Sequence, residues 1–528
     1  MSRPGILPLL AVLALPLAGC DNPGSPEIDR DACARAGLQQ AAYAGDVQLG
    51  VGQAAELAPG ASLCLVLPDA SREYALAYLD TRAIEASRTA REPFRSDSFT
   101  VGVRDFQGGG PQPLRRLRAP AGGAPAFTGL PDGTDFLPVA NVSAAASFHP
   151  ALREAPWTQG EAFTLFDNLR QVDRPARVHR VYGGWLVAVA FEDEPQPTLP
   201  QTLAHLDAQW PLLSSTGLPL LRGIFGDLRP VTSGGSNQLL MVIRADLIDF
   251  GAAGVAFGAV VDDQVYSYIA VLPNDAHGVR NATGTGSLVF HEVTHTFQRS
   301  YLAAHAQNTP PSTSAGAARW GVEGGATLMQ RELARRQAGI GATANYDWVS
   351  PGGTEVEEWY KRFAQPGRGE LTAGYSAAAG FMMDLAQRRT AAGEGLDAAL
   401  EEVMRGSIEG WFGHAVQGDF TGLAARMRSR LGSGWEPAEA VLQWTLSHAA
   451  DDRTPSATFQ NRAFRDAWNV QGGLGWEPHG TLAAGSGAWF EEKRLYGSSG
   501  FAYLAGRGGV YHLTAGVDGV RWMIVRIR

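Results

Sequence analysis

The stretch Val289-Phe290-His291-Glu292-Val293-Thr294-His295-Thr296-Phe297-Gln298 decides how the rest of this 528-residue chain is interpreted. Residues four apart lie on one face of an α-helix, so the imidazoles of His291 and His295 can bind one metal ion together. Glu292 projects near the same edge, within reach of a water bound to that metal. Two imidazoles, a third ligand and an open position suit zinc, which lowers the pKa of its water to about 7. The motif therefore predicts a zinc site with Glu292 as the general base for amide hydrolysis.

The alternative interpretation of this motif is a helix that carries two solvated histidines, because so short a pattern also arises by chance. The flanking residues disfavour that alternative. Ser287 is placed to cap the helix, and the apolar run 288–290 predicts that the start of the helix is buried. Histidines that directly follow a buried turn need polar partners, and a metal ion supplies them.

The third metal ligand is predicted from the chain downstream. Gln298 and Tyr301 stand where an H-E-x-x-H-x-x-G-x-x-H pattern needs Gly and His, so that type of site is excluded. A helical pattern beyond a loop rich in Pro, Ser, Thr and Ala carries Glu323, which we predict to be the third ligand. Glu332 lies nine residues further on, on the opposite helix face, so we expect it to be a solvated charge. His305 is a weaker candidate, more typical of a surface histidine.

H-E-V-T-H-T-F-Q at 291–298 and W-G-V-E-G-G-A at 320–326 together resemble the H-E-x-x-H…W-x-x-E-G-x-A pattern of the gluzincin metallopeptidases. Within that group the chain is most similar to the hyicolysin-like secreted and lipoprotein members of bacteria, over roughly residues 170–450. The resemblance implies a zincin catalytic domain, one Zn²⁺ ion and hydrolysis of peptide bonds. Carried over residue by residue, it assigns the zinc ligands to His291, His295 and Glu323 and the catalytic base to Glu292.

Two further points concern the same resemblance. Tyr375 lies in G-Y-S-A-A-A-G at 374–380, a setting similar to that of a tyrosine in related aminopeptidases that donates to the oxyanion. Tyr375 is therefore the candidate for stabilising the tetrahedral intermediate, and a tyrosine packed against helix neighbours is the alternative. Thr327 departs from the pattern, because many relatives have a supporting acid four residues after the third ligand, whereas Thr327 offers only a hydroxyl.

Residues 1–20 have the pattern of a lipoprotein signal peptide. Arg3 gives a positive start, an apolar core follows, and Leu17-Ala18-Gly19-Cys20 resembles a bacterial lipobox. The pattern predicts cleavage before Cys20, acylation of its thiol, and a protein anchored by lipid to a membrane of the bacterial cell envelope, facing the periplasm or the cell exterior. An ordinary signal peptide with a bystander cysteine is the alternative. No other apolar run approaches the roughly 20 residues that span a bilayer.

Cys33 and Cys64 remain once Cys20 is assigned to the lipid anchor. An even pair of cysteines outside the cytosol favours a disulfide. Closing that loop would stabilise the fold by about 3–4 kcal/mol in the chain-entropy model. Two free buried thiols are the alternative.

The composition and the absence of other motifs narrow the function further. A net charge of −9 gives no positively charged footprint, so we expect no nucleic-acid partner. The sequence contains no G-x-S-x-G, no G-x-x-x-x-G-K-[ST] and no C-x-x-C pattern. We therefore expect a protein or peptide substrate, while nothing in the sequence indicates an oligomeric state.

The chain is predicted to be α+β, with a zincin-like catalytic domain at 160–450. A tether and an N-terminal β domain at 21–150 precede it, and a small β unit at 470–528 follows it. Short β-like runs separated by Gly and Pro turns make both flanking units sandwich-like. The helical patterns over 396–449 belong to the catalytic domain.

The segment that leads to the metal-binding helix has strand patterns at 177–191, 239–243 and 265–272 and a helix pattern at 199–213. We expect 265–272 to form the sheet edge beside the metal, where an extended peptide would add as one more strand. The predicted function is a zinc-dependent peptidase in which Glu292 activates the attacking water. The competing hypothesis is an inactive zincin-fold lipoprotein that uses its β units for binding or adhesion, although it would have no physical need for Glu292.

Overall fold

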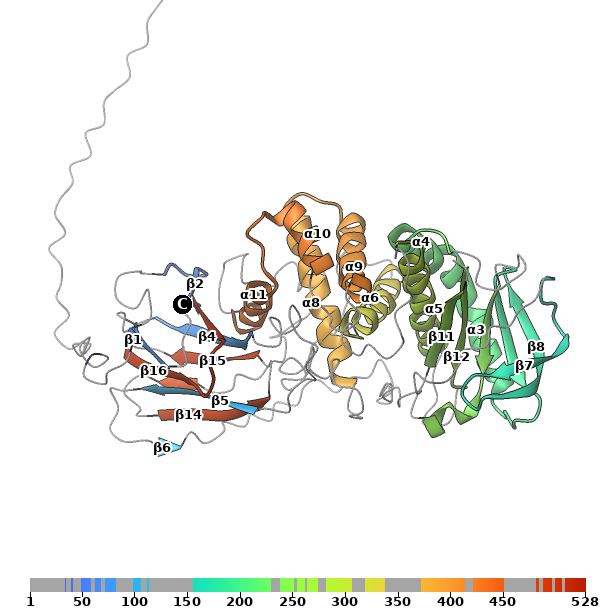
Figure 1. Ribbon diagram of the computed structural model, residues 1–528, viewed down its shortest axis with the longest axis horizontal. Coiled ribbons are helices and arrows are strands. Elements are labelled where there is room, and N and C mark those ends of the chain that lie inside the picture. Colours follow the sequence, from blue (N-terminus) through green and yellow to red (C-terminus); the bar gives the residue numbers. More distant parts are fainter. Residues whose placement is uncertain are drawn as a thin grey trace, which may run out of the picture.

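The computed structural model describes residues 34, 39–40, 49–57, 62–67, 72–81, 98–105, 112–113, 155–228, 238–250, 254–261, 264–273, 282–305, 319–337, 372–413, 421–450, 481–483, 488–495, 499–505 and 509–528. This part of the chain has a mixed α+β fold, as the sequence predicts. Figure 1 shows a β-sandwich at one end, a six-stranded sheet at the other, and helices between them.

Strands from both ends of the chain build one β-sandwich. One sheet has the order β1-β3-β16-β5-β14-β6 and the other the order β13-β15-β4-β17-β2. Their bounds are β1 Gln39–Gln40, β2 Ala54–Glu56, β3 Ser62–Leu67, β4 Tyr74–Asp80, β5 Ser98–Asp105, β6 Gln112–Pro113, β13 Thr481–Ala483, β14 Ala488–Leu495, β15 Ser499–Ala505, β16 Gly509–Ala515 and β17 Val520–Arg526. β16 lies between β3 and β5, and β4 lies between β15 and β17.

This interleaving corrects the predicted architecture at the two ends. The segments 21–150 and 470–528 are not two separate β units, because their strands alternate within the same two sheets. The physical reason is that each set of strands alone would leave backbone donors and acceptors unpaired at its edges. Pairing β4 with β15 on one side and β17 on the other satisfies both of its edges.

β4 connects the sandwich to the helices, because it is buried on both faces. Successive side chains of a strand point to opposite faces. Leu76 and Tyr78 belong to the core between the two sheets. Ala75 and Ala77 belong to the core that also contains the buried side of α11 (Pro437–Ala450). The small alanine side chains let α11 approach the sheet closely, so the sandwich and the helical layer share a continuous core.

The helical layer in the middle of Figure 1 also contains α8 (Thr372–Ala391), α9 (Leu396–Gly413) and α10 (Thr421–Leu431). The sequence pattern predicts mostly helix over 396–449, and the described residues of this segment confirm the prediction. Their buried apolar residues join one core with the six-stranded sheet. Among the described helices, none combines the length and the apolar character needed to cross a membrane.

The six-stranded sheet has the order β11-β12-β10-β9-β8-β7. Its strands are β7 Ala162–Asp167, β8 Val172–Tyr182, β9 Leu186–Phe191, β10 Leu239–Ile243, β11 Gly254–Val261 and β12 Gln264–Val271. β9, β10 and β12 run parallel, and the other pairs are antiparallel. α3 (Leu199–Leu212) and α4 (Leu218–Phe225) belong to the core on one face of this sheet.

The predicted strand at 177–191 is two strands joined by a tight turn. Gly183 and Gly184 both have positive φ, at 55° and 68°. The amide of Trp185 donates to the carbonyl of Tyr182 across this turn. Tyr182 pairs with Leu186, so three residues form the turn, and glycine is the residue that most readily takes the left-handed backbone of the first two. The glycine pair is the sequence signal that separates β8 from β9.

The sequence predicts that 265–272 forms the sheet edge beside the metal-binding helix. The edge strand is instead β11. β12 is an inner strand, with β10 on one side and β11 on the other. β11 pairs antiparallel with β12 along its whole length, from Gly254 opposite Val271 to Val261 opposite Gln264. The stretch 254–261 is rich in glycine and alanine, which are weak strand formers, so its pattern carries little signal.

The predicted anchor and disulfide fall mostly outside this part of the chain. The signal segment 1–20, Cys20 and Cys33 are not among the described residues. Cys64 lies in β3 and is disulfide-bonded. Its pairing with Cys33 stays a prediction.

Candidate metal centre

Two helices carry the candidate metal centre, α5 (Ala282–His305) and α6 (Arg319–Gln337). On α5, Val289, Phe290, Val293 and Phe297 are all buried. This spacing is the apolar stripe of a helix that packs on a core. α5 begins at Ala282, so Ser287 is an interior residue and not the predicted cap. Thr285 and Gly286, directly before Ser287, are already buried, so the helix packs on the core from that point onward.

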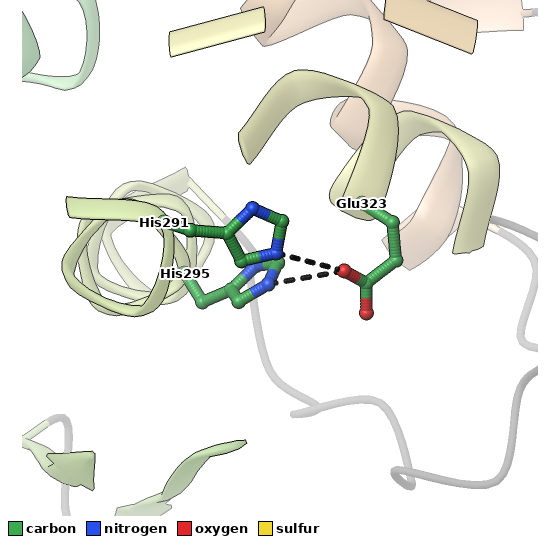
Figure 2. Close-up of side chains that lie close together, drawn as sticks. All are labelled: His291, His295 and Glu323. Carbon is green, nitrogen blue, oxygen red and sulfur yellow. Dashed lines mark hydrogen bonds and ion pairs between the residues drawn. The ribbon is translucent and has the colours of Figure 1, made fainter. Parts of the chain in front are cut away.

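The structure brings His291, His295 and Glu323 together, as Figure 2 shows. The Nε2 atoms of His291 and His295 each lie 3.2 Å from the same oxygen, Oε2 of Glu323. The histidines come from consecutive turns of α5 and the glutamate from the facing turns of α6. All three side chains are buried or nearly so. The residues that the sequence predicts as ligands thus face one point from two neighbouring helices.

Each histidine is held on its far side by a glutamine. Nδ1 of His291 lies 3.0 Å from Oε1 of Gln330, and Nδ1 of His295 lies 2.9 Å from Oε1 of Gln298. An amide oxygen only accepts, so each Nδ1 carries the hydrogen and each Nε2 is the nitrogen that faces Glu323. Thr327 plays no such role, because its buried hydroxyl makes no hydrogen bond within the described residues.

The donor set fits a divalent cation such as zinc. Burial alone would raise the pKa of the Glu323 carboxyl, but His295 and His291 hold that pKa well below its usual range. An ionised carboxylate oxygen and two imidazole nitrogens therefore converge on one point, where a cation would be stabilised. Zinc bonds of 2.0–2.1 Å imply ligand atoms about 3.3 Å apart, close to the separations observed.

Glu292 lies beside these ligands and is 4% exposed. Burial raises its pKa to about 8, against the opposing charge of His291. Arg299, two turns along α5, further opposes this shift and donates to the carbonyls of Phe257 and Ala256 in β11. The carboxyl therefore lies between the metal-binding face of α5 and the edge strand of the sheet. A cation held by the neighbouring ligands would lower this pKa toward neutrality, which suits a general base.

Gly254, the first residue of β11, lets the edge strand approach Glu292. A Cβ atom at this position would lie 2.4 Å from Oε1 of Glu292 and 2.8 Å from its Cδ. Neither distance is sterically possible, so any side chain here would displace the carboxyl or the strand. Absence of a Cβ at Gly254 is thus a condition for the position of Glu292.

We expect Gly254→Ala to lower kcat for peptide hydrolysis by up to about 100-fold, because small misplacements of a reacting group have effects of that size. Zinc content should not change, since the three atoms nearest to the added methyl group all belong to Glu292 and not to a ligand. Steady-state kinetics and metal analysis check both expectations. Gly223→Ala is the matched control, because that position in α4 has open space around it. A Gly254→Ala protein with unchanged kcat would contradict the positioning role.

The other sequence candidates lie elsewhere. Glu332 is fully buried and accepts a hydrogen bond from Arg336, so the expectation of a solvated charge was wrong. The reason is that α6 is enclosed by other helices on both sides, with its far face against α8 and α9. His305 is the last residue of α5. Tyr375 lies near the start of α8, and its side chain is outside the described part, so its role stays a prediction.

Comparisons with known proteins found a distant structural likeness. No family model matches the sequence, and no curated protein matches it. A crystal structure of an aminopeptidase N family protein from Idiomarina loihiensis is a weak structural neighbour. It has 12% sequence identity and a TM-score of 0.28, and the match covers 53% of this chain and 51% of that one. The match thus spans about half the length of that structure, a likeness too low to decide the fold.

Proposed function

We propose that this chain is a zinc-dependent peptidase of the gluzincin type. The observation that carries the proposal is the convergence of His291, His295 and Glu323 on one point, with the carboxyl of Glu292 buried beside them. The aminopeptidase-like neighbour is compatible with this proposal but adds no weight to it. We further propose that the protein is the envelope lipoprotein that the sequence of residues 1–20 predicts, acylated at Cys20.

A zinc ion held by the two histidines and Glu323 would polarise the scissile carbonyl and lower the pKa of the attacking water. Glu292 then accepts a proton from that water and delivers it to the leaving amine. The enclosure of Glu292 between α5 and β11 excludes bulk solvent from this proton transfer. Tyr375 remains the proposed donor to the oxyanion.

The substrate is proposed to bind along the outer edge of β11. An edge strand presents backbone donors and acceptors that an extended peptide can pair with. β11 begins at Gly254, next to Glu292, so a peptide paired there would pass the reacting carboxyl. This assignment moves the expected substrate strand from 265–272 to 254–261.

Metal removal tests the proposal. We expect a zinc chelator to abolish hydrolysis of a mixed peptide library by the full chain, because the ligands alone supply no electrophile. Addition of Zn²⁺ should restore hydrolysis, whereas Ca²⁺ should not, since two imidazoles suit zinc and calcium prefers oxygen ligands. Product formation is followed by mass spectrometry. A chain that binds zinc and cleaves no peptide would instead support the inactive binding lipoprotein.

A further inference from the structure

Two glutamines connect the candidate ligands to the packing of α5 against α6. Gln298, on α5, accepts from His295 and donates through Nε2 to the carbonyl of Val322 on α6, at 2.9 Å. Gln330, on α6, accepts from His291 and donates through Nε2 to the carbonyl and the hydroxyl of Ser287 on α5, at 3.0 and 3.1 Å. Each helix thus sends one glutamine across to the other.

Only an amide can make both contacts. A backbone carbonyl accepts hydrogen bonds, so the amide nitrogen must face it and the amide oxygen must face the imidazole. A carboxylate at either position would place one of its oxygens against a carbonyl oxygen, and an aliphatic side chain would make neither bond. The contact with the opposite helix therefore fixes the orientation of the amide, and the amide fixes the hydrogen on Nδ1 of the histidine.

Gly325 provides the space for one of these contacts. A Cβ atom at Gly325 would lie 2.9 Å from Nε2 of Gln298. This glycine belongs to the segment W-G-V-E-G-G-A that also carries Glu323. The same turn of α6 thus supplies a ligand and admits the glutamine that orients another ligand.

We propose that Gln298 and Gln330 are positioning residues that set the metal affinity of the site by coupling the histidine orientation to the docking of α5 on α6. This inference rests on the proposed zinc site. Its consequence is reciprocal: separation of the two helices releases both imidazoles, and metal binding holds the helices together. Many relatives have a supporting carboxylate at the position of Thr327. In this chain the neutral amides of Gln298 and Gln330 orient the imidazoles instead, without adding charge.

The test uses Gln298→Met and Gln330→Met in the full chain, because methionine keeps the length of the side chain and removes both hydrogen bonds. We expect the zinc affinity, measured by chelator competition, to fall 10–100-fold in each variant, as for other groups that orient a metal ligand. Gln238→Met is the matched control, since Gln238 is a buried glutamine bonded to the amide of Trp157, away from the site. The zinc affinity of the Gln238→Met chain should stay within about twofold of that of the unmodified chain, a small change beside the 10–100-fold losses expected for the two test variants.

Proton NMR of the cobalt-substituted chain gives a second measurement that a general loss of stability would not reproduce. The ligand histidines should give two shifted Nδ1–H signals protected from solvent exchange. Gln330→Met should remove the protection of the His291 signal alone, and Gln298→Met that of the His295 signal alone. Unchanged affinity and two protected signals in both variants would overturn the inference and leave the zinc site in place. A chain that binds neither zinc nor cobalt would instead overturn the proposed function.

Discussion

Replacement of Glu292 by glutamine is expected to lower kcat for peptide hydrolysis by a factor on the order of 10²–10⁴, the contribution typical of a general base. Glutamine has nearly the shape of glutamate but cannot accept the proton of the attacking water. The loss should therefore come from the chemical step and not from rearrangement of the site. Rates are compared at saturating peptide concentration.

Two controls accompany this variant. Zinc content should stay at one ion per chain, because Glu292 is not among the three converging side chains. The thermal midpoint should not fall, because a neutral amide in this buried place avoids the desolvation that opposes ionisation of Glu292. Full activity of the Glu292→Gln chain would show that another group activates the water.

Replacement of Glu323 by alanine is expected to weaken zinc binding by more than about 100-fold, beyond the effect of removing a group that only orients a ligand. Glu323 supplies the single carboxylate oxygen that faces both imidazole nitrogens. Without it, two neutral histidines remain for a divalent ion. Chelator competition on the purified chain measures the change, and peptide hydrolysis should be lost in parallel.

Glu332→Ala is the matched control for this experiment. Glu332 is a buried glutamate of the same helix, nine residues away and bonded to Arg336. Its loss should lower stability, because it removes the buried carboxylate that Arg336 pairs with along α6, and should leave zinc affinity unchanged. Zinc retained in Glu323→Ala and lost in Glu332→Ala would reverse the choice made between these two acids.

The sequence predicted the three side chains that converge at the candidate metal centre, but not the residues that hold them in place. Helical spacing places His291 and His295 on one face, and the same period separates Glu323 from Glu332. The roles of Gln298 and Gln330 depend on how α5 and α6 dock, which no local pattern encodes. In the sequence, Gln298 showed only that the chain lacks the glycine of the H-E-x-x-H-x-x-G-x-x-H type of metal site. The role of Gly254 could not be predicted either, because a glycine has no side chain whose chemistry indicates a function.

The predicted strands and helices were largely correct, whereas their pairing was not. Strand patterns at 239–243 and 265–272 correspond to β10 and β12. The identity of the edge strand depends on β11, whose small residues gave no clear period. The joint sandwich depends on contacts between distant segments, and local periodicity contains no information on which strands pair.

The sandwich has a consequence for how this protein is made. Thr81 and Gly519 are bonded to each other although 438 positions separate them in the chain. A chain that leaves the ribosome from its N-terminus must keep β2, β4 and β5 without their paired strands, and β3 without β16, until the last strands emerge. Such distant pairings form slowly and leave open strand edges exposed meanwhile. During synthesis these first strands should depend on a chaperone, and a chain cut short before β17 should aggregate.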